Sequence, residues 1–259
     1  MRIGDQPLDT IILEPKNRAP KYTIIWSNGI CTTYKDYMLL LGPLSEEARI
    51  IAYNYRSHGG SKERFSPRGA VKELEGLVED QDGPVFLGGH CTGAAISSSV
   101  KSDVQGRVLV CPYLGSDYLS TLPKAIMRLG RLLPICYMDR FIDYTGLVKC
   151  FGVENRKPIQ DVISLWRFQP SLTGSSAMWM VSPNDEIIGT LYSKDLYMRL
   201  RQQLKSSYQN GVDKSRLVKG LTHSLNRFPG HLLPFLAACH PKRRQKIVDA
   251  ILEYCESRV

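Results

Sequence analysis

The stretch Val85-Phe86-Leu87-Gly88-Gly89-His90-Cys91-Thr92-Gly93-Ala94-Ala95 decides the fold of this chain. An apolar run is followed by a tight turn between glycines and then by small residues, which predicts a strand, a sharp turn and a helix. The core of the stretch has the form G-x-S-x-G with Cys91 in place of serine. This pattern is typical of a nucleophile elbow, a turn that exposes one side chain at the end of a strand. The glycines are expected because a side chain beside the nucleophile would overlap the neighbouring strand and helix. The stretch therefore predicts acyl transfer through a thiolate.

Outside this stretch, apolar segments alternate with segments of helical spacing. The expected strands are 10–13, 22–26, 48–53, 84–87, 107–111, 178–182 and 217–221. The expected helices are 34–44, 66–79, 92–100, 191–204 and 242–254. The strands are continuous apolar runs, which favours a mostly parallel sheet with helices on both faces. We therefore predict an α/β fold.

The alternation of strands and helices breaks after residue 111, where residues 119–169 have mainly helical spacing. We predict a core formed by residues 1–113 and 171–259, with residues 114–170 inserted as a helical lid. A long insert at the carboxyl edge of a parallel sheet usually covers the ligand crevice. Trp166 lies in this insert and is a candidate for contact with the substrate.

A nucleophile at such a turn needs a base, and the base needs a carboxylate that orients it. Asp185 follows the expected strand 178–182, and His223 follows the expected strand 217–221. Because carboxyl ends of parallel strands meet at one edge of the sheet, both side chains are expected to converge on Cys91. Glu186 and Asp117 remain alternatives for the acid, and His231 for the histidine.

The order of nucleophile, acid and histidine along the chain resembles that of the α/β-hydrolase superfamily. Residues 26–30 resemble the His-Gly oxyanion loop of that family, with Asn28 in place of the histidine. Residues 54–61 resemble its Asp-x-Arg-Gly-x-Gly-x-Ser turn, with Asn54 in place of the acid. Together with the elbow, these stretches identify the chain as a member of the superfamily with an α/β-hydrolase fold.

The resemblance implies a triad of Cys91, His223 and Asp185. It also implies an oxyanion hole formed by the backbone N–H groups of Ile30 and Thr92. The N-terminal dipole of the helix that begins at Thr92 is expected to favour both the oxyanion and the thiolate. Asn28 and His90 flank these positions and are candidates for contact with the substrate, His90 alternatively being structural.

A cysteine in this place resembles dienelactone hydrolases, polyhydroxyalkanoate synthases, and some polyketide or peptide thioesterases. The acyl-enzyme would be a thioester, which remains reactive toward water, amines, thiols and alcohols. We predict cleavage or transfer of the acyl group of an ester or thioester. A lactone hydrolase and a non-catalytic binding protein of the same fold are the alternatives.

Composition limits the partners and the compartment. The formal charge of +9 favours acidic partners, such as a substrate carried on coenzyme A or on an acyl carrier protein. The sequence has no nucleic-acid-binding motif and no apolar run long enough to cross a membrane, and its first residues do not predict a secretory signal. The seven cysteines have no zinc-site spacing, so we expect reduced thiols, a cytoplasmic location and no metal or other cofactor. The oligomeric state is left open.

Overall fold

A computed structural model describes residues 2–3, 6–30, 32–59, 64–113, 115, 161, 164–165, 167–171, 177–180 and 241–259. The expected strand 217–221, the expected helix 191–204 and most of the expected lid 114–170 lie outside these residues. Trp166, Asp185 and His223 also lie outside them, and their roles remain predictions.

The described core is a six-stranded sheet in the order β3-β5-β4-β6-β7-β8. Its strands are β3 (Thr10–Leu13), β4 (Thr23–Ser27), β5 (Arg49–Tyr53), β6 (Val85–His90), β7 (Gly106–Val110) and β8 (Ala177–Met180). Only β3 runs antiparallel to its neighbour, and the other pairs are parallel. The predicted α/β fold with a mostly parallel sheet is therefore confirmed. A short antiparallel pair, β1 (Arg2–Ile3) with β2 (Gln6–Pro7), precedes the sheet and was not expected.

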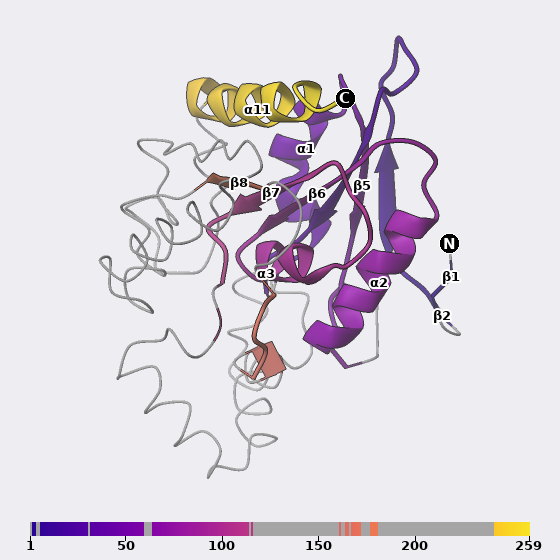
Figure 1. Cartoon of the computed structure of the whole chain (residues 1–259), viewed down its shortest axis with the longest axis vertical. Coiled ribbons are helices and arrows are strands. Elements are labelled where there is room, and N and C mark those ends of the chain that lie inside the picture. The colour runs from indigo at the N-terminus through magenta and orange to yellow at the C-terminus, as the bar shows by residue number, and fades with distance from the viewer. Residues whose placement is uncertain are drawn as a thin grey trace.

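Helices cover both faces of this sheet (Figure 1). On one face, α1 (Met38–Leu44) and α11 (Pro241–Glu256) contribute to a hydrophobic cluster with Trp26, Phe86 and Met178. On the other face, α2 (Pro67–Glu79) and α3 (Thr92–Ser99) contribute to a second cluster with Ile25, Leu87 and other strand residues. Two-sided coverage explains why the strands are apolar throughout.

Local sequence explains where two of the helices begin. Ser66 caps α2, because its Oγ accepts a hydrogen bond from the N–H of Gly69 at 3.3 Å, and Pro67 occupies the first helical position. The expected helix 34–44 is instead divided into a 3-10 turn, η1 (Tyr34–Tyr37), and α1. A capping box between Thr33 and Asp36 begins this 3-10 turn.

Strand β4 lies between β5 and β6 in the sheet. After β4 the chain first forms β5 on one side of it and then crosses to form β6 on the other side. The carboxyl ends of β4 and β6 therefore flank the point at which the strand order reverses, where sheets of this kind bind their ligands. The residues after β4 and after β6 form the candidate site.

Candidate active site

Cys91 occupies a strained turn between β6 and α3. Its φ of 51° and ψ of −111° lie in a region that residues with a Cβ rarely adopt. Three backbone hydrogen bonds hold it there: its N–H donates to the carbonyl of Val110 at 2.9 Å, and its carbonyl accepts from the N–H groups of Tyr113 at 3.1 Å and Ala95 at 3.2 Å. Neighbouring structure thus maintains the conformation of the turn.

Two glycines allow the close packing around this turn. A Cβ on Gly89 would overlap the backbone of Gly93 and Ala94 in the first turn of α3. A Cβ on Gly93 would overlap the carbonyl groups of Ser27 and Asn28 at the end of β4. The steric reason expected for both glycines is therefore present in the structure.

Positive φ angles of non-glycine residues occur at one edge of the sheet. Among the described residues they are Cys91, Cys111 and Ser57, with φ angles of 51°, 44° and 74°. Cys91 and Cys111 directly follow β6 and β7, and Ser57 lies in the loop after β5. Backbone strain often clusters at functional sites, so it supports this carboxyl edge as the active site.

Cys91 differs from the other described cysteines in its exposure. Its side chain is partly exposed, whereas those of Cys111 and Cys255 are buried. Burial also raises the pKa of the Cys255 thiol. Within the described part of the chain, Cys91 is thus the thiol that a substrate can reach.

The loop that resembles the oxyanion loop follows β4 directly. Asn28 is fully buried, and its carboxamide donates to the carbonyl of Tyr53 at 2.7 Å and to Asn54 Oδ1 at 3.4 Å. The hydroxyl of Tyr55 donates to the backbone carbonyl of Asn28 at 2.7 Å. These bonds anchor the loop to β5 and the segment after it. The side chain of Asn28 supports the loop, and its contact with substrate stays a prediction.

The two asparagines that depart from the family pattern therefore lie against each other. Asn54 also accepts from the N–H of Tyr34 at 2.9 Å and donates to Asp9 Oδ2 at 2.7 Å. Asp9 precedes β3 and is exposed, and its carboxylate lies against the side chain of Asn54. Sequence analysis missed Asp9, because nothing in its local sequence indicates this partner.

His90 is the last residue of β6 and is 4% exposed. Its Nδ1 lies 3.2 Å from the hydroxyl of Tyr37, which is itself buried. The structure thus places His90 beside the loop after β4, on the face covered by α1. Its contact with substrate stays a prediction.

Thr92 and Ile30 carry the expected oxyanion-hole amides. Thr92 is the first residue of α3, so its N–H has no acceptor within the helix and lies at the positive end of the helix dipole. Its Oγ1 is buried with no hydrogen-bond partner among the described residues. Ile30 follows Gly29 in the loop after β4 and is partly buried. The structure thus places both amides beside the reversal point between β4 and β6.

A buried polar cluster lies after β5 at the same edge of the sheet. Ser57 Oγ donates to Asp161 Oδ2 at 2.5 Å and lies 3.2 Å from His58 Nδ1. All three side chains are buried, and desolvation lowers the pKa of His58 to about 4. Asp161 comes from the predicted lid segment, so this cluster joins that segment to the core. The sequence analysis missed Asp161.

The expected base His223 and acid Asp185 lie outside the described residues, as does Trp166. In the part of the chain that the structure describes, no group of three His, Cys, Asp or Glu side chains is placed to hold a metal ion. Of the described helices, none has the length and apolar character needed to cross a membrane.

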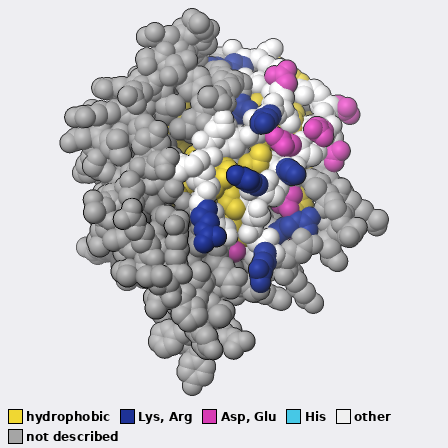
Figure 2. Space-filling model, turned by 60° about the horizontal axis from the view of Figure 1, so that its bottom comes forward, with side chains coloured by type: hydrophobic (Ala, Val, Ile, Leu, Met, Phe, Trp, Pro, Cys, Tyr) yellow, Lys and Arg dark blue, Asp and Glu magenta, His cyan; other side chains and the backbone are white. Residues whose placement is uncertain are grey.

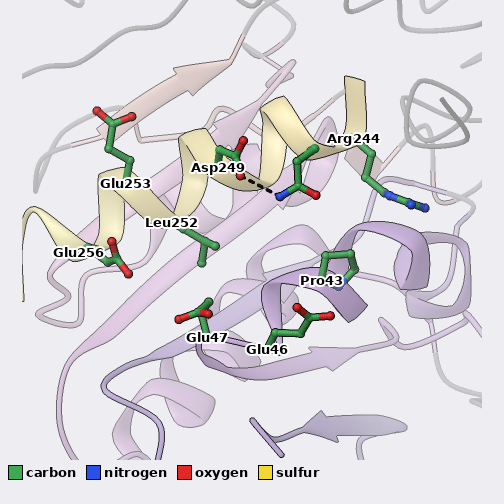
Figure 3. A pocket seen from close by; sticks show the side chains of 9 residues that line it. Pro43, Glu46, Glu47, Arg244, Asp249, Leu252, Glu253 and Glu256 are labelled. Atoms are coloured by element: carbon green, nitrogen blue, oxygen red, sulfur yellow. Dashed lines mark hydrogen bonds between the residues drawn. The ribbon is translucent and has the colours of Figure 1, made fainter. Parts of the chain in front are cut away.

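A groove lies between α1 and α11, away from the elbow (Figure 3). Its acidic lining residues are Glu46, Glu47, Asp249, Glu253 and Glu256, and Arg244 also lines it. Glu46 and Glu47 lie just before β5, so the groove is at the amino ends of the strands, opposite Cys91. It is therefore separate from the candidate active site.

Charges of both signs are present on the described surface. On the face shown in Figure 2, Lys and Arg side chains surround a small hydrophobic area, and several carboxylates lie beside them. Some charges are paired, as in the exposed pair of Arg49 with Glu14 at 2.7 Å. Exposed pairs of this kind contribute little to stability.

The sheet order, the strained turn after β6 and the loop after β4 define an α/β-hydrolase fold. The sequence matches the model of the alpha/beta hydrolase family over residues 24–233, and the chain belongs to this family. A search of curated proteins found no match.

Solved structures support the same fold at low sequence identity. A carboxylesterase of the ammonia-oxidizing thaumarchaeon Nitrososphaera gargenis aligns with a TM-score of 0.67 and 14% identity, covering 100% of this chain and 99% of that one. A lipase-esterase related protein of Clostridium acetobutylicum aligns with a TM-score of 0.63 and 16% identity, covering 95% and 98%. An enol-lactonase of Burkholderia xenovorans aligns with a TM-score of 0.59 and 13% identity, covering 95% of each chain.

Proposed function

We propose that this chain is an acyl-transfer hydrolase that cleaves esters or thioesters through a covalent acyl-cysteine at Cys91. The observation that carries the proposal is the partly exposed Cys91 in a strained turn at the start of α3. Strained backbone conformations cluster at active sites, where the strain can be part of the mechanism. Membership of the alpha/beta hydrolase family supports a hydrolytic use.

In the proposed reaction, the Cys91 thiolate attacks the carbonyl carbon and the carbonyl oxygen becomes an oxyanion. The N–H groups of Thr92 and Ile30 stabilise this oxyanion, and loss of one such donor typically costs about 3–4 kcal/mol. The intermediate expels the alcohol or thiol, which takes a proton from His223, oriented by Asp185. His223 then removes a proton from water, which attacks the acyl-cysteine and releases the acid and the Cys91 thiolate.

The proposal extends to the substrate and its surroundings. The insert 114–170 covers the acyl group, with Trp166 against it, and coenzyme A or an acidic carrier protein presents the acyl group to this basic protein. Asn28 and His90 lie near the reacting group. A reduced nucleophile requires a reducing compartment, so we place the protein in the cytoplasm.

The test is intact-protein mass spectrometry after brief exposure to p-nitrophenyl acetate and to acyl-coenzyme A thioesters, followed by peptide mapping. We expect an acyl adduct on Cys91, no adduct at this peptide in Cys91→Ala, and turnover reduced at least about a thousandfold. Cys255→Ala is the matched control, because it removes a buried thiol far from the elbow in sequence. Wild-type turnover in Cys91→Ala would overturn the proposal.

The same assay separates hydrolysis from transfer. With an added amine or alcohol, a hydrolase still yields the free acid as the main product. Acceptor adducts in place of free acid would identify a transferase, because the acyl-cysteine would then be protected from water. Absence of any adduct and of any turnover would favour a non-catalytic binding protein of this fold.

A further inference from the structure

Tyr37 connects the two segments that would form the oxyanion hole. Its hydroxyl accepts a hydrogen bond from the N–H of Gly29 at 2.6 Å and lies 3.2 Å from Nδ1 of His90. Gly29 directly precedes Ile30, and His90 directly precedes Cys91. One side chain therefore bridges the loop after β4 and the strand that carries the nucleophile.

We propose that Tyr37 is a positioning residue that holds the oxyanion loop, and with it the N–H of Ile30, in register with Cys91. This inference rests on the proposed function, because it assigns Tyr37 a role in the same acyl-transfer site.

The hydroxyl of Tyr37 contacts Gly29 and Thr32 of the loop and His90 of the strand. A tyrosine hydroxyl has one proton and two lone pairs, and one lone pair accepts from Gly29. Thr32 Oγ1 lies 3.1 Å from the same hydroxyl, but its proton is directed to the carbonyl of Gly29 at 2.8 Å. In the contact between Tyr37 and His90, either the hydroxyl or the Nδ1–H of the imidazole is the donor, depending on the tautomer of His90. In both arrangements the loop and the strand stay connected.

The ring that carries this hydroxyl is held rigidly. Tyr37 is 1% exposed, and its ring centroid lies 5.9 Å from that of Trp26 and 6.2 Å from that of His90. Burial raises its pKa well above the ordinary value, so the hydroxyl keeps its proton at neutral pH. Donors held by a packed scaffold stabilise a transition state without reorganisation, which is the requirement for an oxyanion hole.

The loop lies directly on this hydrogen-bonded pair. A Cβ built on Gly29 would lie 3.1 Å from the hydroxyl of Tyr37 and 3.1 Å from Nδ1 of His90. That separation is tighter than ordinary van der Waals contact, so a methyl group at position 29 requires the loop or its neighbours to shift by a few tenths of an ångström. Gly29→Ala therefore disturbs the same contact from the opposite side.

The test compares two reactions of Cys91 in Tyr37→Phe. Acylation by p-nitrophenyl acetate passes through an oxyanion, whereas alkylation by iodoacetamide is a direct displacement that forms none. We expect acylation of Cys91 to slow by about 10- to 100-fold, because small misplacements of catalytic groups have effects of this size. Alkylation should change less than about threefold, and the loss should fall on kcat rather than on KM.

Tyr22→Phe is the matched control. Tyr22 is buried in the same hydrophobic cluster, and its hydroxyl has no hydrogen-bond partner among the described residues. Removing that hydroxyl should leave both reactions at wild-type rates. If Tyr37→Phe does not fold, as judged by circular dichroism, Gly29→Ala takes its place and the same selective loss is expected.

Two results would overturn the inference. Acylation at the wild-type rate in a folded Tyr37→Phe would mean that the hydroxyl does not position the loop. Equal losses in acylation and alkylation would mean that the variant alters the thiol itself. Both differ from failure of the proposed function, in which the wild-type protein forms no acyl adduct on Cys91.

Discussion

Gly93 in the first turn of α3 approaches Ser27 at the end of β4 so closely that a Cβ on Gly93 would overlap the Ser27 carbonyl oxygen. This contact brings the helix after the nucleophile against the strand that leads into the oxyanion loop. The relative position of the two halves of the site therefore depends on the absence of one side chain.

Gly93→Ala is expected to destabilise the protein by about 3 kcal/mol or more, because strand and helix must separate to admit a methyl group. Urea unfolding followed by circular dichroism measures this change. Gly42→Ala is the matched control, since Gly42 lies in α1 and a Cβ there would meet no atom within 4 Å. That variant should be stabilised by about 0.5–1 kcal/mol. Equal effects of the two substitutions would contradict the steric explanation.

Cys91→Gly and Cys91→Ala should differ in stability although both lack the thiol. Alanine keeps the Cβ at a φ of 51°, whereas glycine adopts this conformation without strain. We expect Cys91→Gly to be more stable than Cys91→Ala by about 1 kcal/mol. Measuring the free energies of unfolding of the two variants gives this difference in stability. An alanine variant as stable as the glycine variant would mean that the turn stores no strain.

Asn54→Asp should be destabilising at neutral pH, because it places a second carboxylate against Asp9 and removes the hydrogen bond at 2.7 Å. The free energy of unfolding is expected to decrease by about 2 kcal/mol. Asp9→Asn in the same chain should restore most of it, since an amide then faces the new carboxylate. The double-mutant cycle measures this coupling, with Asp9→Asn alone as control. Additive effects would show that the side chains of Asp9 and Asn54 are not energetically coupled.

The stability of the protein should fall in acid because of His58. Desolvation lowers the pKa of this buried imidazole from its ordinary value of 6.5 to about 4. Below the pKa that His58 has in the unfolded chain, the unfolded chain binds a proton that the folded chain excludes. Stability therefore decreases with falling pH until the pH is below the pKa of His58 in the folded chain. Lowering the pH from about 7.5 to about 4.5 should therefore decrease the free energy of unfolding by about 2.5 kcal/mol through this single group.

His58→Phe removes the titrating group and places another ring between Tyr55 and Phe65, whose centroids lie 5.6 Å and 5.8 Å from the imidazole. The difference in unfolding free energy between the two pH values should shrink by about 2.5 kcal/mol, whatever the absolute stability of the variant. His58→Gln provides a second uncharged comparison. An unchanged pH dependence in both variants would assign the acid sensitivity to other groups.

Local patterns in the sequence were sufficient to predict these helices and strands of the core. The apolar run before Cys91 predicts β6, the glycines predict the turn, and Ser66 with Pro67 predicts the start of α2. Each of these features depends on residues within a few positions of one another. The division of residues 34–44 into η1 and α1 was missed, because helical spacing alone does not distinguish a 3-10 turn from an α-helical one.

The sequence by itself determined the fold class and the position of the candidate nucleophile, because periodicity and the size of a side chain act locally. Only the tertiary structure decided which side chains support the site. Tyr37 lies 53 positions from His90, Asp9 lies 45 positions from Asn54, and Asp161 lies 104 positions from Ser57. These hydrogen bonds form only after the sheet has brought the carboxyl ends of its strands together, and no local pattern marks a residue for a partner so distant along the chain.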